Sequence, residues 1–319
     1  MADVTIPNLT EKNSLANNDL FIVENSSTGT GSAKLSTLKN GILGTETINS
    51  LGGASVTDAI KKLNDIVNAD TVSAHNSIAR GKSLGTSVTA DQWASIKNGN
   101  FSNMYIGDYW TINSVVWRIA AFNWYARRTT SNPNHIVIVP DTPIVTGVRM
   151  HSSNSNSGGF AGSELFTQYS ASTSTGGLKT AKDAVDSAFG AAHILEHSMA
   201  LVSAVADGKV TALTSAQAVT VVPMTLANLT GCGANIVYGS TTSGAIVGDE
   251  DGEQFPLFAA FPRLQVATGG YWLRDAYPGN ATGFYAHQTG SSSGGLRQLA
   301  ASSTSNPANI RPAFCIYQA

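Results

Sequence analysis

The sequence predicts an α+β protein with short antiparallel strands and a few helices. Short apolar runs bounded by Gly, Pro, Asn and Ser recur through residues 109–319, and each is typical of a strand. Helical patterns occupy only residues 55–69, 89–97 and 178–206. The composition agrees with this class, since the chain holds 31 Gly, and Ser with Thr make up about a fifth of it.

The composition also excludes several classes of protein. Hydrophobic residues make up 42% of the 319 residues, which is enough to bury a core and excludes global disorder. Charged residues are only 13%, a profile typical of extracellular β-rich and fibrous surface proteins. The net charge of −2, without a Lys/Arg cluster, excludes a nucleic-acid-binding surface. Cys232 and Cys315 are too few for a disulfide framework and leave one bridge open.

Two features of the sequence bear on where the protein is found. The N-terminal residues carry no basic segment followed by an apolar one, so no secretory signal is predicted. No apolar run approaches the roughly 18 residues that span a bilayer. We therefore expect synthesis in a bacterial host cytoplasm without membrane insertion. With the adhesin-like composition, this indicates a virion component that cell lysis releases.

The N-terminal segment, residues 1–54, is short and polar. An apolar run at residues 19–23 predicts a strand, and residues 25–32 form a turn-rich break. Residues 33–38 follow as a second extended or short helical piece. Because the segment is too small for a core of its own, we expect it to need further copies of itself or a docking partner.

Residues 55–72 are predicted to form a helix that joins protomers. Ser55 and Asp58 form a capping box at its start. Apolar residues then follow at spacings typical of a heptad seam: Val56, Ile60, Leu63 and Val67. The same pattern also suits one amphipathic helix on a globular core, and two heptads alone are marginal as a coiled coil. Residues 73–88 carry Ser and Gly and are predicted to be a linker.

The C-terminal domain, residues 89–319, begins with well-marked elements. Residues 89–97 predict a capped helix that stops at Gly99. Residues 109–122 predict a hairpin around Asn113, and residues 135–139 predict a buried strand that ends at Pro140.

The rest of this domain combines one longer helical pattern with loops. Apolar spacing predicts helix within residues 178–206, and short strands with Gly/Ser loops within residues 210–319. Ser/Gly tracts at residues 152–163 and 290–295 are predicted to be exposed loops. Three large aromatic residues are interpreted as core anchors: Trp110, Trp117 and Trp272.

Four short motifs resemble a known family. They are GDYW at residues 107–110, VWRI at 116–119, GGYWLRD at 269–275 and IRPAFCI at 310–316. Over residues 83–319 the chain resembles the C-type-lectin-like receptor-binding proteins of phage tail fibres and head appendages. Related folds also serve as variable proteins of diversity-generating retroelements and as formylglycine-generating enzymes, so the fold alone does not decide the function.

The N-terminal block is similar to attachment segments of phage tail proteins, through NDLFIV at residues 18–23 and LSTL at residues 35–38. The two resemblances imply a homotrimeric virion appendage, such as a tail fibre. Its N-terminus would contact other virion structural proteins, and its distal domain would bind a host-surface glycan or protein. The alternatives are a capsid head fibre or decoration protein, and a hydrolase that acts on surface glycan.

The candidate binding residues lie between Asp275 and Arg297. This stretch is rich in Tyr, Asn, Ser and Gly, the residues of adaptable binding surfaces. Alternation along residues 283–287 places Phe284 and Ala286 on one face and Tyr285 and His287 on the other. The candidates are Tyr277, Asn280, Tyr285, His287 and Arg297. Two other interpretations are an ordinary surface strand and tyrosines that pack between protomers.

One motif is enzyme-like. The segment from His193 through Glu196 to His197 matches the H-x-x-E-H order of inverted zinc proteases. On a helix the two histidines would share a face, but a third ligand is required and the next acidic residues lie in loop-like sequence. We interpret the histidines as polar points on a partly buried helix.

The acidic stretch at residues 248–254 lacks the spacing of an EF-hand loop. It is interpreted as a solvated turn, and a calcium site of the kind some C-type lectins carry stays open as the alternative. Two carboxylates for glycoside hydrolysis also stay open, because their separation is a spatial property. We expect a binding protein without catalytic residues, metal or cofactor.

Overall fold

The computed structural model describes residues 20–25, 29–34, 72–126, 133–170, 177–206, 209–231, 253–277, 280–287, 295–303 and 308–319. The chain divides into two compact units, Met1–Ala69 and Asp70–Ala319. Together the described residues form an α+β protein with mostly short strands, as predicted. None of the described helices has the length and apolar composition needed to cross a membrane.

The described part of the first unit is an antiparallel hairpin. Strand β1 (Leu20–Asn25) pairs with β2 (Gly29–Lys34), with Leu20 opposite Lys34. The strand predicted at residues 19–23 is confirmed. The second strand begins at Gly29, inside the segment predicted to be a turn-rich break, so that break is shorter than expected. The heptad positions Val56, Ile60, Leu63 and Val67 lie outside the described residues.

The predicted linker at residues 73–88 is wrong, because these residues are part of the second unit. Helix α3 (Val72–Ser77) and strand β3 (Ser83–Gly85) both fall in it. The Asn76 side chain makes two hydrogen bonds with the backbone of Phe122. Its Nδ2 donates to the carbonyl at 3.0 Å, and its Oδ1 accepts from the amide at 2.8 Å. Short polar residues that suggested a linker therefore attach α3 to the central sheet.

The central sheet has six strands in the order β11-β15-β6-β5-β4-β3. The four inner strands are β4 (Tyr109–Ile112), β5 (Val115–Phe122), β6 (His135–Pro140) and β15 (Pro312–Tyr317). Strand β11 (Val221–Pro223) forms one edge. All neighbours are antiparallel except β3 and β4. The predicted hairpin is confirmed, and its turn places Asn113 at φ 52° and Ser114 at φ 62°.

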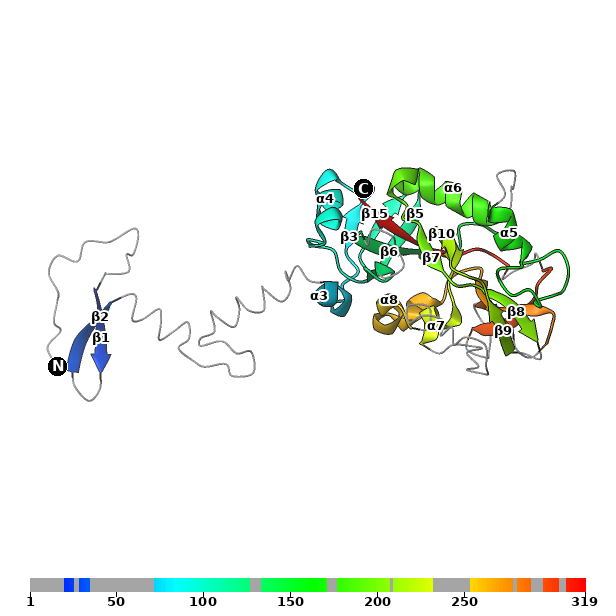
Figure 1. The fold of residues 1–319 in the computed structure, drawn as a ribbon. Helices are drawn as coiled ribbons and strands as arrows, with labels where there is room; N and C mark the ends of the chain where they lie inside the picture. Colours follow the sequence, from blue (N-terminus) through cyan, green and yellow to red (C-terminus); the bar gives the residue numbers. More distant parts are fainter. Residues whose placement is uncertain are drawn as a thin grey trace. The chain divides into compact units, whose positions relative to one another are not determined.

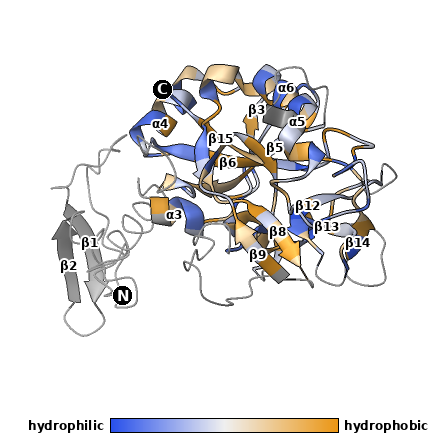
Figure 2. Cartoon of the chain, turned by 45° about the vertical axis from the view of Figure 1, so that its right-hand side comes forward, coloured by the Kyte–Doolittle hydropathy of each residue, from blue (hydrophilic) through white to orange (hydrophobic). Residues whose placement is uncertain are grey.

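Helices cover both faces of this sheet (Figure 1). Helices α4 (Ala90–Asn98), α5 (Glu164–Ser170) and α6 (Gly177–Phe189) lie on one side. Helices α3, α7 (Leu226–Thr230) and α8 (Pro256–Ala260) lie on the other, and a 3-10 turn, η4 (Pro262–Gln265), follows. The sheet strands between them are mostly hydrophobic (Figure 2). The three tryptophans predicted as core anchors are buried.

Helix α4 shows why its sequence signal was reliable. The Thr89 side chain accepts from the amide of Gln92, whose side chain accepts from the amide of Thr89. Gly99 then ends the helix at φ 74°, a left-handed conformation that glycine adopts without strain. The same Gln92 side chain accepts from the indole of Trp110 at 3.0 Å, which ties the cap to the core.

The helix predicted within residues 178–206 is only half right. Helix α6 ends at Phe189, and Gly190 at φ 85° turns the chain away. After it come the 3-10 turn η3 (Ala191–His193) and four short strands. These strands are β7 (His197–Met199), β8 (Val202–Ala206), β9 (Lys209–Leu213) and β10 (Gln217–Val219). The apolar residues after Gly190 therefore follow a strand pattern, which short runs do not distinguish from a helix.

A separate three-stranded sheet carries the candidate binding residues. Its strands β12 (Tyr271–Ala276), β13 (Gly283–His287) and β14 (Leu296–Ala300) pair antiparallel in chain order. This sheet lies at the end of the second unit away from α3 (Figure 1). The tract at residues 152–163, predicted to be exposed, instead buries Asn156 and Phe160.

Candidate functional site

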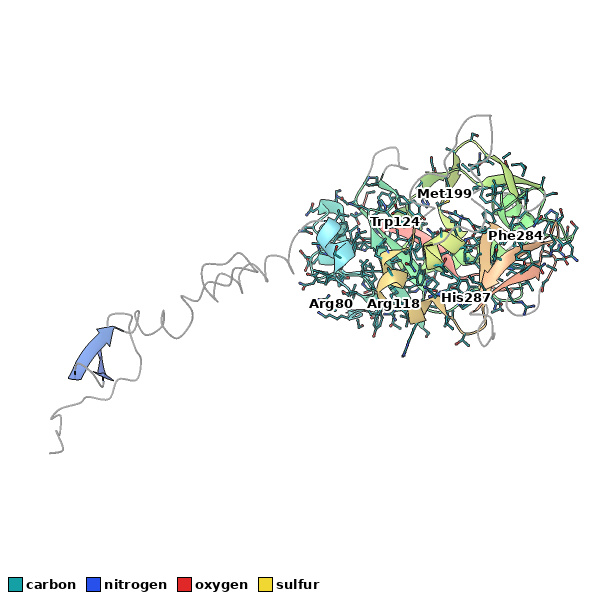
Figure 3. All side chains as sticks on the ribbon, turned by 90° about the horizontal axis from the view of Figure 1, so that it is seen from below. Arg80, Arg118, Trp124, Met199, Phe284 and His287 are labelled. Atoms are coloured by element: carbon teal, nitrogen blue, oxygen red, sulfur yellow. The ribbon has the colours of Figure 1, made fainter. Side chains whose placement is uncertain are left out.

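The turn between β12 and β13 presents the candidate residues. Strands β12 and β13 pair with a bulge, so that Trp272 faces Ala286 and Ala276 faces Phe284. The amide of Tyr277 donates to the carbonyl of Gly283 at 2.9 Å and closes the turn. Figure 3 shows Phe284 of β13 on the side of the second unit away from Arg80, which follows α3, with His287 between them. The turn is therefore at the distal end of the second unit.

Asn156 holds this turn from a distant part of the chain. Its Nδ2 donates to the carbonyls of Tyr277 at 3.1 Å, Asn280 at 3.0 Å and Gly283 at 2.7 Å. Its own amide donates to the carbonyl of Ala281 at 3.0 Å. The residue is buried, and its Oδ1 has no hydrogen-bond partner. A buried amide that leaves one oxygen unsatisfied is costly, so its contacts to the turn must stabilise it substantially.

Tyr277 and Tyr285 form the aromatic part of the site. Their ring centroids are 5.2 Å apart, and the ring planes meet at 67°. Both residues are half-buried, so each side chain is in part exposed to solvent. Burial raises the pKa of Tyr285, and the neighbouring Tyr277 and Asp275 raise it further. The phenol of Tyr285 is therefore neutral at physiological pH and keeps its hydroxyl hydrogen.

Asp275 supplies the negative charge next to this pair. Its Oδ2 accepts from the amide of Leu226 at 2.6 Å, at the start of α7. The carboxylate is half-buried, and its field reaches Tyr285, whose pKa it raises. Sequence reasoning used Asp275 only as the boundary of the candidate stretch, because an acidic residue at a strand end has no signal that marks it as part of a site.

The other predicted residues do not all join this pair. Asn280 is exposed, and its Oδ1 accepts from the amide of Thr282 at 3.0 Å and from its hydroxyl at 2.8 Å, so it shapes the turn. Arg297 is exposed but lies opposite Ala286, whereas Tyr285 lies opposite Gln298. Directly opposite residues share a face, so Arg297 is on the face of the sheet away from Tyr285.

The prediction that His287 lies on an exposed face is wrong. The residue is 3% exposed and stacks on Tyr271, with ring centroids 5.3 Å apart. Burial, and then the guanidinium of Arg311, lower the pKa of His287 to about 4. The alternation along β13 is present, but Tyr271 covers the face on which His287 lies. His287 is therefore a neutral core residue.

The zinc-protease motif is not on a helix. His193 is the last residue of η3, and its ring stacks on that of Trp93 with the centroids 4.1 Å apart. Its Nδ1 lies 3.1 Å from the carbonyl oxygen of Tyr317. His197 begins β7 and stacks on Tyr125 at 4.2 Å. The expected helix with two polar points is therefore wrong. Among the described residues no group of three or more His, Cys, Asp or Glu is arranged to hold a metal ion.

A Ser–His–Glu cluster also falls short of a catalytic triad. The Oγ of Ser153 lies 3.2 Å from the Nδ1 of His151, and Glu164 Oε1 lies 4.0 Å from that same nitrogen. A triad needs the nucleophile and the orienting carboxylate on opposite ring nitrogens. A hydrogen bond from the Ser152 side chain holds the pKa of Glu164 below its usual value. The cluster is therefore a surface hydrogen-bond network.

The cysteines do not form the bridge that the sequence left open. Cys315 is a free thiol, fully buried in β15, and burial raises its pKa. Cys232 lies outside the described residues, as does most of the acidic stretch at 248–254.

Comparisons with protein-family models, curated proteins and solved structures find no match to this chain. The functional argument therefore rests on the sequence motifs together with the fold and the site described above.

Proposed function

We propose that this chain is a phage virion appendage, a tail fibre or receptor-binding protein, that binds a host-surface glycan or protein. The proposal combines the resemblance of its motifs to C-type-lectin-like receptor-binding proteins with one structural observation. That observation is the pair of half-exposed rings, Tyr277 and Tyr285, on the turn that Asn156 holds.

The position of the tyrosine pair supports an orientation in which the N-terminal residues attach to the virion and the second unit faces the host. Helix α3 begins the described part of the second unit, and the sheet of β12, β13 and β14, which carries the turn with the tyrosine pair, lies at the end of that unit away from α3 (Figure 1). A protein attached to a particle through its N-terminal residues would then present this end of the second unit to the host. The proposed attachment role of residues 1–54 and the proposed homotrimer are parts of the same hypothesis.

The chemistry of the pair supports binding to a surface ligand. A tyrosine ring offers a rigid apolar face for a sugar or a peptide, while its hydroxyl stays hydrated. A central aromatic residue typically contributes about 2 kcal/mol or more to an interface. Three copies on one appendage would convert weak single-site affinity into strong attachment.

Adsorption of the protein to host cells tests the proposal. We expect the double substitution of Tyr277→Ala and Tyr285→Ala to abolish adsorption while light scattering shows an unchanged oligomer. Tyr109→Ala is the matched control, because Tyr109 is also half-buried but lies on β4 of the central sheet. Normal adsorption of the double variant would refute this site, and a light-scattering profile of a stable monomer would refute the homotrimer.

A further inference from the structure

The side chain of Gln298 lies beside the tyrosine pair. Gln298 is directly opposite Tyr285 in the pairing of β13 with β14, so the two side chains share a face of the sheet. A Cβ added to Gly283 would lie 2.3 Å from the Nε2 of Gln298, so the Gln298 carboxamide lies over the space that this glycine leaves open. The carbonyl of Gly283 in turn accepts from the amide of Tyr277 at 2.9 Å. Tyr277, Tyr285 and Gln298 are therefore grouped around Gly283.

The polar groups of these three residues are left for a ligand. All three side chains are half-buried. Among the described residues, none forms a hydrogen bond with the hydroxyl of Tyr277, the hydroxyl of Tyr285 or the carboxamide of Gln298. Water that hydrates such groups can be replaced by a ligand that supplies matching hydrogen bonds. Because the groups are two phenols and a carboxamide, they select for hydrogen bonding rather than for charge.

The aromatic part of this site needs only one open ring face. Tyr277 and Tyr285 meet edge-to-face at 67°, so their contact covers a face of one ring only. The C–H groups of a sugar ring pack on an aromatic face, and the sugar hydroxyls then lie at the rim of that face. There the Gln298 carboxamide can donate to one hydroxyl and accept from the next. A sugar therefore uses the rings and the carboxamide together.

The residues around these three are small and polar. Asn280 and Thr282 of the turn are exposed. The carbonyl of Thr282 accepts from the amide of Ala301 at 3.0 Å, and the hydroxyl of the next residue, Ser302, donates to Asn154 at 2.6 Å. A protein partner is usually anchored by large aromatic or charged side chains in apolar pockets. Exposed hydroxyls and amides around an aromatic pair instead favour a glycan.

We propose that Tyr277, Tyr285 and Gln298 bind an uncharged sugar of a host-surface glycan, and that the Gln298 carboxamide selects its hydroxyl or acetamido groups. The inference rests on the proposed function and names both the ligand class and a further binding residue of the same site. The place of Gln298 in the site depends on the register of β13 with β14, which the sequence pattern does not show.

Competition for adsorption of the full chain identifies the ligand class. Polysaccharide released from the host cell wall is separated by anion exchange into a neutral and an anionic fraction, and each fraction is used as a competitor. We expect the neutral fraction to inhibit adsorption at a concentration at least about fivefold lower than the anionic fraction. Digestion of the cells with proteinase K should leave adsorption unchanged. A neutral fraction that inhibits no better than the anionic one, or adsorption that proteinase K abolishes, would overturn the proposal.

Substitution of Gln298 tests its role in the site. Gln298→Met keeps a side chain of similar length without the carboxamide, and its affinity for the neutral fraction should fall about three- to tenfold, the effect of one or two neutral hydrogen bonds. Gln298→Asn, which draws the carboxamide back by one methylene, is a second variant with the same expectation if circular dichroism shows that the first is unfolded. Gln318→Met is the matched control, because Gln318 is also half-buried but follows β15 of the central sheet. Unchanged affinity of the folded Gln298 variant would overturn the assignment of Gln298.

The failure of this inference is distinguishable from failure of the proposed function. Cell adsorption that depends on Tyr277 and Tyr285, but that the neutral fraction does not inhibit, overturns the sugar proposal and keeps the receptor-binding proposal. Adsorption that proteinase K abolishes has the same meaning and indicates a protein receptor. Cell adsorption that is unchanged when both tyrosines are replaced overturns both proposals.

Discussion

Asn156 should control both the stability of the second unit and the geometry of the tyrosine pair. Asn156→Ala removes the Nδ2 that donates to the carbonyls of Tyr277, Asn280 and Gly283. Gly283 keeps the amide of Tyr277 as a donor, so the first two carbonyls lose more than the third. The Nδ2 has only two hydrogens, so the three contacts amount to two full hydrogen bonds, and at about 1 kcal/mol for each the loss is about 2 kcal/mol.

One gain offsets part of this loss. The Oδ1 of Asn156 is buried without a partner, and its removal returns about 1 kcal/mol. The net expectation is that Asn156→Ala lowers the free energy of unfolding by about 1 kcal/mol, roughly a fivefold change in the ratio of folded to unfolded protein. Asn156→Asp should be worse than Ala, because it points carboxylate oxygens at three carbonyl oxygens.

Urea unfolding measures the stability, and the absorbance of ionised tyrosine near 295 nm measures the geometry. Burial, Tyr277 and Asp275 raise the pKa of Tyr285, so a displaced turn should let Tyr285 ionise closer to its ordinary value. The difference between titrations with and without Tyr285→Phe isolates this residue. If Asn156→Ala left the unfolding curve, the titration and cell adsorption unchanged, the positioning argument would be refuted.

Two further predictions concern the core. His135 is buried, its Nε2 accepts from the amide of Tyr125, and burial lowers its pKa to about 4. The unfolded chain, with an ordinary His pKa near 6.5, binds the proton first, so the contribution of His135 to stability should fall by about 3 kcal/mol as the pH drops from about 6.5 to about 4. Because the pKa of His287 is also lowered, the difference between urea unfolding of the wild-type chain and of His135→Gln across that range measures this contribution. Gly159 has φ 57°, and an added Cβ would lie 2.3 Å from the carbonyl oxygen of Val202. Gly159→Ala should therefore lower the free energy of unfolding, measured in urea, by about 3 kcal/mol. Gly85→Ala should lower it less, because its φ of 118° is strained for alanine but the nearest atom lies 3.7 Å from the added Cβ.

Elements whose signals are local could be predicted from the sequence. The capping box of Thr89 and Gln92 and the left-handed turn at Asn113 each depend on residues within a few positions of one another. The buried strand before Pro140 and the last strand of the chain also combine a short apolar run with a proline. In the cap and the hairpin turn, the hydrogen bonds that form the element involve the same residues that give the pattern. The two strands pair with each other from distant parts of the chain, and their apolar runs alone mark them as strands.

Elements whose own residues give no distinct pattern, and which depend on distant partners, could not be predicted. The Ser- and Gly-bearing residues around Asn76 suggested a linker, because nothing near them shows that Phe122 supplies the matching backbone groups. The apolar residues after Gly190 fit a helix or strands equally, and the pairing of β7 with β10 decides between them. His287 has the expected alternation, but Tyr271 on another strand covers it.

The candidate site combines both kinds of information, which explains why the sequence identified only part of it. The Tyr-rich composition marks the turn, because it is a property of the turn itself. The contribution of Asn156 is invisible in the sequence, since its three acceptors are backbone carbonyls about 120 residues away, and any residue at those positions has one. Because Asn156 contacts backbone groups that any residue carries, we expect the turn to tolerate changes of its side chains while its backbone stays in place.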